Sequence, residues 1–237
     1  MKNSEFDKYL SSGFEKANQR ESQRYSEELE LNYAEFLPLD KEAGILDIGC
    51  GMGQFIAYLR KNGYRSVSGI DVGQEAVDYC RKKGIDNVLK IDSLADFLSK
   101  NIEKFDLIIL KSVIAHLPRR ELISILSAAR SSLKHGGRLV VETFNASVWT
   151  GVFMRYNDFT HRNAFTENSL RQVLLLAGFT EIEISPNRYL IKKPSQIIAF
   201  LVRKIWQMVL SYIYIAERGT GSNPHILSKL LIAVAEK

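Results

Sequence analysis

The sequence predicts an α/β protein with a doubly wound, seven-stranded sheet, on three observations. Short apolar runs alternate with helical patterns along most of the 237 residues, which is typical of a parallel sheet with crossover helices. The first apolar run leads directly into a glycine-rich turn, as in sheets that hold a ligand at the carboxyl ends of their strands. Hydrophobic residues at 46% and charged residues at 25% are ordinary globular values, which argues against disorder and repeat architectures.

Seven apolar runs are predicted to form the strands, and five amphipathic stretches the helices between them. The strands are residues 45–48, 66–70, 87–91, 106–110, 138–144, 180–185 and 228–235. The helices are residues 54–62, 74–83, 94–100, 119–133 and 167–177. A capping pattern of Thr166 and Ser169 begins the last of these helices, and Gly178 ends it.

Two helical segments lie outside this alternation. Residues 3–37 are polar and end before Pro38, and residues 194–216 form a strongly apolar stretch between the sixth and seventh strands. We therefore expect one domain over residues 1–237. Its parts are an N-terminal helical cap (1–44), a ligand-binding core (45–190), a helical insertion or lid (191–227) and a final strand (228–237).

The apolar segment 194–216 carries one narrow polar stripe. Its members recur at helical spacing, and they are Gln196, Arg203, Gln207, Ser211 and Arg218. Because Arg203 and Lys204 interrupt the segment, a membrane span is not expected. Three alternatives remain open: an acceptor lid, a homodimer contact, and an in-plane membrane helix with the basic residues Lys192, Lys193, Arg203 and Lys204. The simplest expectation is a helix packed on its own domain.

Charge and cysteine content restrict the expected partners and the cellular compartment. The net charge of +5 comes from residues 187–237, which hold eight Lys and Arg against two Glu, so we expect a local basic patch and no nucleic-acid partner. Cys50 and Cys80 lack metal-binding partners at the usual spacing, which indicates a reducing compartment. The first twenty residues lack the apolar region of a signal peptide, so the expected location is the cytoplasm, or the inner face of the membrane if 194–216 contacts lipid.

The run ILDIGCGMG, residues 45–53, indicates the ligand. Asp47 is followed by Gly49, Gly51 and Gly53, whereas a dinucleotide fingerprint would need a small residue at position 54, which is Gln54. A carboxylate beside the turn suits a ligand with an ammonium and hydroxyl groups, and it would repel a pyrophosphate. S-adenosylmethionine, with its amino acid tail, ribose and sulfonium, meets these requirements.

Other strand ends carry matching groups. Asp71 follows the glycine turn by about twenty residues, where a carboxylate can accept both ribose hydroxyls. Asp92 ends the third strand, where it can bind the adenine amine or cap the following helix. The fourth strand delivers Lys111 and Ser112, and the fifth delivers Glu142.

In these motifs the chain resembles a class I S-adenosylmethionine-dependent methyltransferase, a Rossmann-like fold. The matching pieces are ILDIGCGMG, GIDVGQEAV, the Asp92 corner, FDLIILKSVIAHLP and LKHGGRLVVETFN, which span residues 45–145 in the family's order. The resemblance implies S-adenosyl-L-methionine as cofactor, with the three glycines beside its methionine and ribose, Asp71 on the ribose, and Asp92, Ser93 and Leu94 on adenine. The remaining expected cofactor-binding residues are Asp47, Cys50, Val72 and Lys111.

The acceptor is indicated by two further features. Residues 156–179 (YNDFTHRNAFTENSLRQVLLLAGF) resemble methyltransferases of bacterial surface-polysaccharide and sugar pathways. After the fourth strand, Leu110–Val113 lacks the N/D-P-P-Y-like signature of the amino-group methyltransferases that act on nucleic-acid bases or glutamine, which argues against base N-methylation. We therefore expect O-methylation of a sugar hydroxyl of a glycan or glycolipid precursor. The alternatives are a methyltransferase for a small metabolite such as a quinone or natural product, and a regulatory protein that binds the cofactor without transferring its methyl group.

A hydroxyl acceptor needs a base, and histidine is the commonest near neutral pH. His161 is preferred as the catalytic base, with Asp158 holding its ring or contacting the acceptor, and His116 is the second candidate. In many relatives an acid precedes the equivalent of His116, and here that residue is Ala115. Asp158 and His161 could also hold a divalent cation, as in some sugar methyltransferases, but two candidate ligands make a weak case, so no metal ligands are assigned and the need for a cation stays open.

Overall fold

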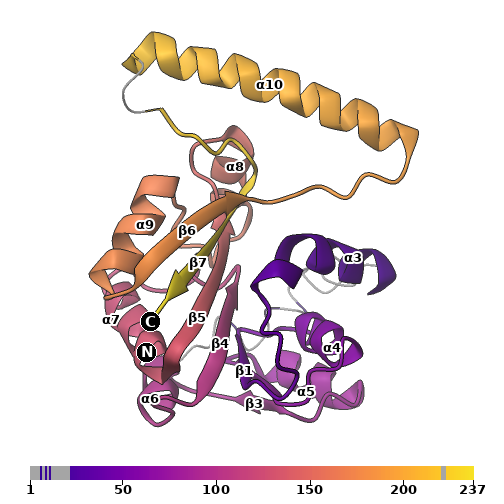
Figure 1. Ribbon diagram of the computed structural model, residues 1–237, viewed down its shortest axis with the longest axis vertical. Coiled ribbons are helices and arrows are strands. Elements are labelled where there is room, and N and C mark those ends of the chain that lie inside the picture. The colour runs from indigo at the N-terminus through magenta and orange to yellow at the C-terminus, as the bar shows by residue number, and fades with distance from the viewer. Residues whose placement is uncertain (1–5, 7–8, 10, 12–21, 220–222) are drawn as a thin grey trace.

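A computed structural model of the chain (Figure 1) describes residues 6, 9, 11, 22–219 and 223–237. In these residues it has a seven-stranded sheet with helices on both faces, which confirms the predicted fold class. Most of the predicted N-terminal helix before residue 22 lies outside the described residues. Its described part forms α3 (Ser22–Tyr33) and the 3₁₀ turn η2 (Ala34–Phe36), which ends before Pro38 as expected.

The strands of the described sheet lie close to the predicted runs. They are β1 (Ile45–Ile48), β2 (Val67–Asp71), β3 (Val88–Lys90), β4 (Phe105–Lys111), β5 (Leu133–Phe144), β6 (Thr180–Pro186) and β7 (Leu230–Glu236). Their order in the sheet is β3-β2-β1-β4-β5-β7-β6. The pairs from β3 to β5 are parallel, and β7 is antiparallel to both β5 and β6.

Helices cover both faces of the sheet, because the central strands carry apolar side chains on both faces. The covering helices are α4 (Gln54–Lys61), α5 (Gln74–Lys82), α6 (Leu94–Ser99), α7 (Leu122–Ser132) and α9 (Glu167–Leu176). In β4, Ile108 and Leu110 belong to one core cluster with residues of α6, α7 and α9, whereas Leu107 and Ile109 belong to a second with residues of α3, α4 and α5. This alternation follows from the period of two residues along a strand.

Two local differences separate the prediction from the structure. Helix α8 (Trp149–Asn157) was not predicted, because its sequence WTGVFMRYN combines aromatic, β-branched and glycine residues of low helix propensity and has no side-chain cap. A Cβ at Gly151 would lie 1.8 Å from the Asn145 carbonyl oxygen, so α8 packs directly on the end of β5. Strand β5 begins five residues early, since Leu133 pairs with Phe105 before a register shift.

The strand order reverses beside β1, and this positions the ligand site. The chain runs outward from β1 through β2 to β3 and then returns to pair β4 with the other side of β1. Ile48 at the end of β1 is level with Ile70 of β2 and Leu110 of β4. Ligands of such sheets bind in the crevice outside these carboxyl ends.

Helix α10 (Pro194–Arg218) differs from the simplest expectation. It was expected to pack on its own domain, but within it only Leu210 is buried. In Figure 1 it extends at the top of the molecule, beyond the end of the sheet and above α8. It is long and apolar enough to cross a membrane by length and composition, with 6% of its most apolar stretch buried. The expected packing on its own domain is therefore confined to one narrow side of α10, and the rest of the helix surface is exposed.

Candidate active site

The three glycines between β1 and α4 have different tasks. All three have positive φ, which favours glycine. A Cβ at Gly49 would lie 2.5 Å from Val113, and one at Gly53 would lie 2.7 Å from Ile85, so these two glycines allow close packing inside the protein. A Cβ at Gly51 would meet nothing within 4 Å. Gly51 is therefore the glycine that leaves open space beside the backbone.

Asp71 at the end of β2 holds this turn in place. Its Oδ2 accepts a hydrogen bond of 2.9 Å from the Gly51 amide, and its Oδ1 accepts one of 2.8 Å from the Gly73 amide. Burial raises the pKa of Asp71, and these amide hydrogen bonds oppose the rise. The carboxylate therefore shapes the turn as well as lining the cavity beside it.

A cavity of about 710 Å³ lies at this edge of the sheet, within the usual size of small-molecule sites. Among the predicted site residues, those on its wall are Asp47, Gly49, Cys50, Gly51, Asp71, Val72, Asp92, Ser93, Leu94, Lys111 and His116. In the described part of the chain, Gly53, Asp158 and His161 are not on the wall. Most of the predicted set is therefore brought together, and Asp158 and His161 lie behind it.

Asp47 is buried on the wall of the cavity, 2% exposed. Burial raises the pKa of its carboxyl to about 7, although Lys111 lowers it in part, and Asp71 adds to the rise. A cationic group beside such a buried carboxyl lowers its pKa, because the cation stabilises the charged form. This fits the ammonium that the sequence assigns to its vicinity.

Lys111 at the end of β4 belongs to a buried network. Its Nζ lies 3.0 Å from Glu142 Oε1, and the Tyr33 hydroxyl donates a 2.7 Å hydrogen bond to Glu142 Oε2. Burial alone would lower the pKa of Lys111, but Glu142 and Tyr25 together outweigh it and the pKa is raised. The same lysine keeps the pKa of Glu142 below its ordinary value despite burial. The network fixes Lys111 between the cavity and the fifth strand.

Asp92 was given two alternatives, adenine contact and helix capping. The cap of α6 is Ser93, whose Oγ accepts a 3.2 Å hydrogen bond from the Asp96 amide. The Asp92 side chain is 98% exposed, lies 3.4 Å from Lys90 Nζ and lines the cavity. The capping role therefore belongs to Ser93, and the adenine contact stays a prediction for Asp92.

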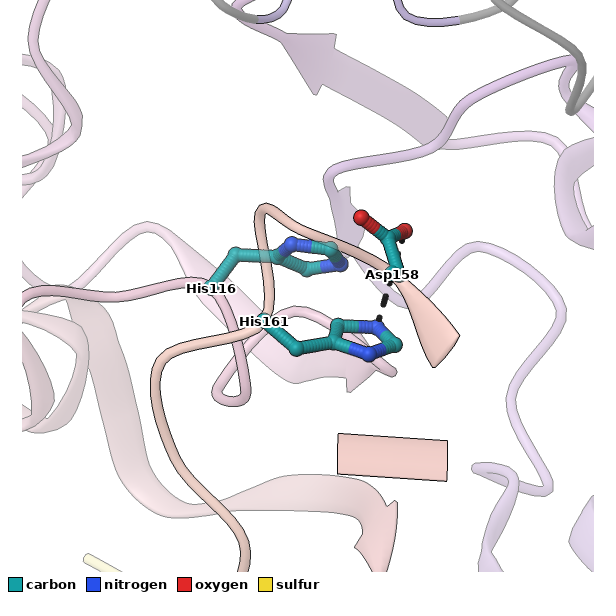
Figure 2. Close-up of side chains that lie close together, drawn as sticks. All are labelled: His116, Asp158 and His161. Carbon is teal, nitrogen blue, oxygen red and sulfur yellow. Dashed lines mark ion pairs between the residues drawn. The ribbon is translucent and has the colours of Figure 1, made fainter. Parts of the chain in front are cut away.

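Two loops bring His116, on the wall, together with Asp158 and His161 behind it (Figure 2). The loops are joined by backbone hydrogen bonds from Arg162 and Asn163 to the Ala115 carbonyl. His161 Nε2 lies 3.8 Å from Asp158 Oδ2, and the two imidazole rings have centroids 4.6 Å apart. Figure 2 shows both rings directed toward the carboxylate.

The hydrogen bonds of this cluster determine which ring nitrogens carry protons. Burial raises the pKa of Asp158, but hydrogen bonds from Tyr9 and Thr160 outweigh it and keep the pKa low, so Asp158 is a carboxylate. Thr160 Oγ1 donates to Asp158 Oδ1 at 2.7 Å, so it can only accept from His116 Nδ1 at 3.0 Å. Likewise His161 Nδ1 donates to the Met154 carbonyl at 2.7 Å. The Nε2 atoms of both rings are therefore left for a proton or an ion.

His116 is the histidine of this cluster on the cavity wall. Burial, followed by the neighbouring His161, lowers its pKa to about 4. At neutral pH its imidazole is uncharged, and its Nε2 has a free lone pair. The sequence alone ranks His161 first, since linear spacing to Asp158 is visible in the sequence whereas the cavity wall is not.

Aromatic residues near the N-terminus complete the site, and the sequence analysis missed them. The Tyr9 hydroxyl donates a 2.6 Å hydrogen bond to Asp158 Oδ2, and Phe6, Tyr9 and Tyr25 line the cavity. The strong hydrogen bond and burial raise the pKa of Tyr9, so it remains a donor. The only signal in the sequence was the presence of aromatic side chains in an otherwise polar segment.

The cluster also contains the donors of a metal site. One ligand atom from each of His116, Asp158 and His161 lies within 4.8 Å of the others. Imidazole nitrogens and carboxylate oxygens are ligands of Zn²⁺ and related cations. The sequence offered two such ligands, and the structure adds His116 as a third.

Comparisons with known proteins agree with this geometry. A family model described as a methyltransferase domain matches residues 19–184. No curated protein sequence matches the chain. The fold is similar to that of a SAM-dependent methyltransferase from Archaeoglobus fulgidus, with 22% identity over 94% of this chain and 98% of that chain and a TM-score of 0.69.

Two other solved structures show the same fold. One is described as a possible histamine N-methyltransferase from Thermotoga maritima, 20% identical over 98% of this chain and 99% of that chain, with a TM-score of 0.67. The other is 1,6-didemethyltoxoflavin-N1-methyltransferase from Burkholderia thailandensis, 18% identical over 99% of this chain and 86% of that chain, with a TM-score of 0.60. At these identities the likeness concerns the fold.

The residues of the cavity fit S-adenosylmethionine. The open space at Gly51 leaves room beside the backbone, and Asp47 and Asp71 supply carboxylates for an ammonium and for hydroxyl groups. From the family match over residues 19–184, the chain belongs to the methyltransferase family, and it is an enzyme that uses S-adenosylmethionine.

Proposed function

We propose that the enzyme methylates a hydroxyl group, with His116 as the proton acceptor. One observation carries the proposal: an uncharged imidazole lines the cavity, and its Nδ1 is committed to Thr160. A hydroxyl group keeps its proton until the transition state, so a base within reach contributes to the rate. An amine that reaches the site unprotonated needs no such group.

The chain's own residues divide the work as follows. S-adenosylmethionine supplies a methyl group that its sulfonium has already activated. His116 Nε2 takes the hydroxyl proton as the new bond forms. The Asp158 carboxylate then stabilises the imidazolium, since its charge acts to raise the pKa of His116. Thr160 keeps the ring oriented, Tyr9 and Thr160 hold Asp158 by hydrogen bonds, and His161 lies 3.8 Å from Asp158. His161 and Asp158 are thus positioning residues in this mechanism.

For the acceptor we propose a sugar hydroxyl of a glycan or glycolipid precursor. Residues 156–179 resemble methyltransferases of bacterial surface-polysaccharide and sugar pathways, which supports this class. The same segment supplies Asp158, Thr160 and His161 beside the cavity. The second candidate is a small metabolite. It is supported by the fold shared with the 1,6-didemethyltoxoflavin-N1-methyltransferase, whose solved structure contains 1,6-didemethyltoxoflavin and S-adenosylhomocysteine.

The test is a methyl-transfer assay with labelled S-adenosylmethionine and three acceptor panels: nucleotide sugars with isolated glycans, quinols with other phenols, and amines. We expect label in the sugar panel, in a product stable as a methyl ether. Transfer to phenols alone would replace the sugar by the second candidate. Transfer to amines alone would overturn the hydroxyl acceptor.

A parallel arm separates a base from a metal. The enzyme is dialysed against a chelator and assayed before and after addition of Zn²⁺ or Mn²⁺. We expect unchanged activity. Loss of activity that either metal restores would show that the cluster holds a cation in place of the proton, and it would overturn the role of His116 as the base.

A further inference from the structure

Helix α10 has its polar side facing the protein. The Arg203 guanidinium lies 3.5 Å from the centroid of the Tyr189 ring, and Gln207 donates a 2.8 Å hydrogen bond to the Leu227 carbonyl. Tyr214 donates one of 2.9 Å to the Ser147 carbonyl. These residues and the buried Leu210 recur at helical spacing along one side of α10. Two members of the polar stripe, Arg203 and Gln207, therefore attach the helix to the domain.

The opposite side of α10 is apolar and exposed. Its large side chains have exposed fractions of 40–66%, and they are Ile197, Ile198, Leu201, Val202, Ile205, Met208, Val209, Tyr212 and Ile213. At 100° per residue they cover about half of the helix circumference. Single exposed apolar residues are common, but a continuous face of this length marks an interaction site.

The apolar side of α10 continues onto α8. The rings of Trp149 and Trp206 have centroids 5.1 Å apart, so the two helices meet there. On α8 and just after it, Val152, Phe153, Tyr156 and Phe159 are also exposed, Phe159 by 98%. We call these residues and the exposed apolar side chains of α10 the apolar platform. Tryptophan and tyrosine within it are the side chains that prefer the boundary between lipid and water.

The charge around the apolar platform is positive. Residues 187–218 contain six Lys and Arg and a single Glu. The exposed Lys193, Lys204 and Arg218 lie at the start, the middle and the end of α10. Basic residues beside an apolar helix face attract anionic lipid headgroups. The same charges disfavour a second copy of the chain on this face, because like charges would meet.

The contacts of α10 also distinguish lying on a membrane from crossing it. Arg203, Gln207 and Tyr214 attach the middle and the end of the helix to Tyr189, Leu227 and Ser147. A helix that crosses a bilayer would have to break these contacts and place Arg203 in the hydrocarbon. A helix that lies in the plane of the membrane keeps them.

We propose that the apolar platform is a membrane-contact surface, with α10 lying in the interface of an anionic lipid bilayer. Asp158 follows directly after α8 as its C-cap, so α8 connects the apolar platform to the cluster of His116, Asp158 and His161. A bilayer here would hold a lipid-linked acceptor near the site, a consequence that rests on the proposed function. Binding to lipid itself does not depend on the acceptor.

The two tryptophans of the chain, Trp149 and Trp206, both lie in the apolar platform and report on the contact directly. The full chain is mixed with vesicles of phosphatidylcholine alone or with 30% phosphatidylglycerol. We expect a blue shift of the tryptophan emission and co-flotation with the anionic vesicles, and a weakening of both as salt rises. Quenching by lipids brominated near the headgroup should exceed quenching by lipids brominated near the chain end.

The test variant is Leu201→Glu/Ile205→Glu, and the control is Ile102→Glu, an exposed apolar residue far from α10 in sequence. We expect at least about tenfold weaker vesicle binding for the double variant and parent-like binding for the control. Titration with S-adenosylhomocysteine, read without an acceptor, shows that each variant is folded. Absence of a blue shift with anionic vesicles would overturn the proposal. So would a concentration-dependent dimer, in sedimentation, that the double variant abolishes while lipid has no effect.

Discussion

The glycine turn and helix α10 both carry clear sequence patterns, yet only the first could be interpreted correctly from the sequence. In the turn, Asp47, Gly51 and Asp71 meet through local geometry, because neighbouring parallel strands end at one edge. In α10 the polar stripe shows that the helix has a polar and an apolar face, but it does not show which face contacts the protein. A motif that specifies a backbone turn after a strand thus also specifies where in the sheet the turn lies. The direction of an amphipathic helix depends instead on whether its apolar face meets protein, lipid or water.

The largest effect is expected at the turn, from Gly51→Val. The valine side chain would occupy the open space beside the backbone, so affinity for S-adenosylhomocysteine should fall by more than about a hundredfold. Calorimetry measures it. Gly84→Val is the matched control, since Gly84 also has positive φ and open space but lies off the cavity wall. Equal losses in both variants would mean that backbone strain alone is responsible.

Asp71→Ala should weaken the same affinity by about ten- to a hundredfold, because hydrogen bonds to a charged group contribute about 1.5–3 kcal/mol. The structure adds a second cost, since the Gly51 and Gly73 amides lose their acceptor. Urea unfolding should therefore show a loss of about 1–3 kcal/mol. Asp78→Ala, on the exposed side of α5, serves as the control. A parent-like dissociation constant for Asp71→Ala would remove the residue from the cofactor site.

Cofactor affinity should depend on pH through Asp47. Its pKa of about 7 means that the carboxyl gains a proton as pH falls below 7, and a neutral carboxyl no longer attracts an ammonium. Affinity for S-adenosylmethionine should therefore fall by up to about tenfold per pH unit below 7 and stay level above it. Asp47→Asn should remove this dependence. A parent profile that is level from pH 8 to 5.5 would contradict the contact.

The smallest effect is expected in α10, where the size of the stability loss distinguishes the two faces. Gln207→Ala removes the hydrogen bond to the Leu227 carbonyl and should cost about 1 kcal/mol of unfolding free energy. Leu201→Ser, on the exposed face, should change it by less than about 0.5 kcal/mol. Urea titrations of both variants measure the difference. A larger loss from Leu201→Ser would mean that this face is buried in solution.

The sequence predicted most of the sheet and much of the cavity wall, because strand periodicity and the glycine turn are local. It did not predict α8, whose position depends on Gly151 fitting against the Asn145 carbonyl. Nor did it predict that His116 adjoins Asp158, since the two residues meet only through hydrogen bonds between their loops. The contacts of Tyr9 and Tyr33 likewise join the N-terminal segment to distant residues, and no local pattern encodes them.

The role of His116 as the base of the cavity is tested most directly by the single-turnover methyl-transfer rate at saturating cofactor. His116→Ala should lower this rate by about 10² to 10⁴ with cofactor affinity nearly unchanged, and His135→Ala, away from the cavity wall, should not. The parent rate should stay level as pH falls to about 5 and decline only toward the His116 pKa of about 4, where the imidazole gains its proton. If His161→Ala lowers the rate while His116→Ala leaves it within a few-fold of the parent, the base has been assigned to the wrong loop. If neither variant lowers the rate by more than a few-fold, the reaction needs no base from this cluster.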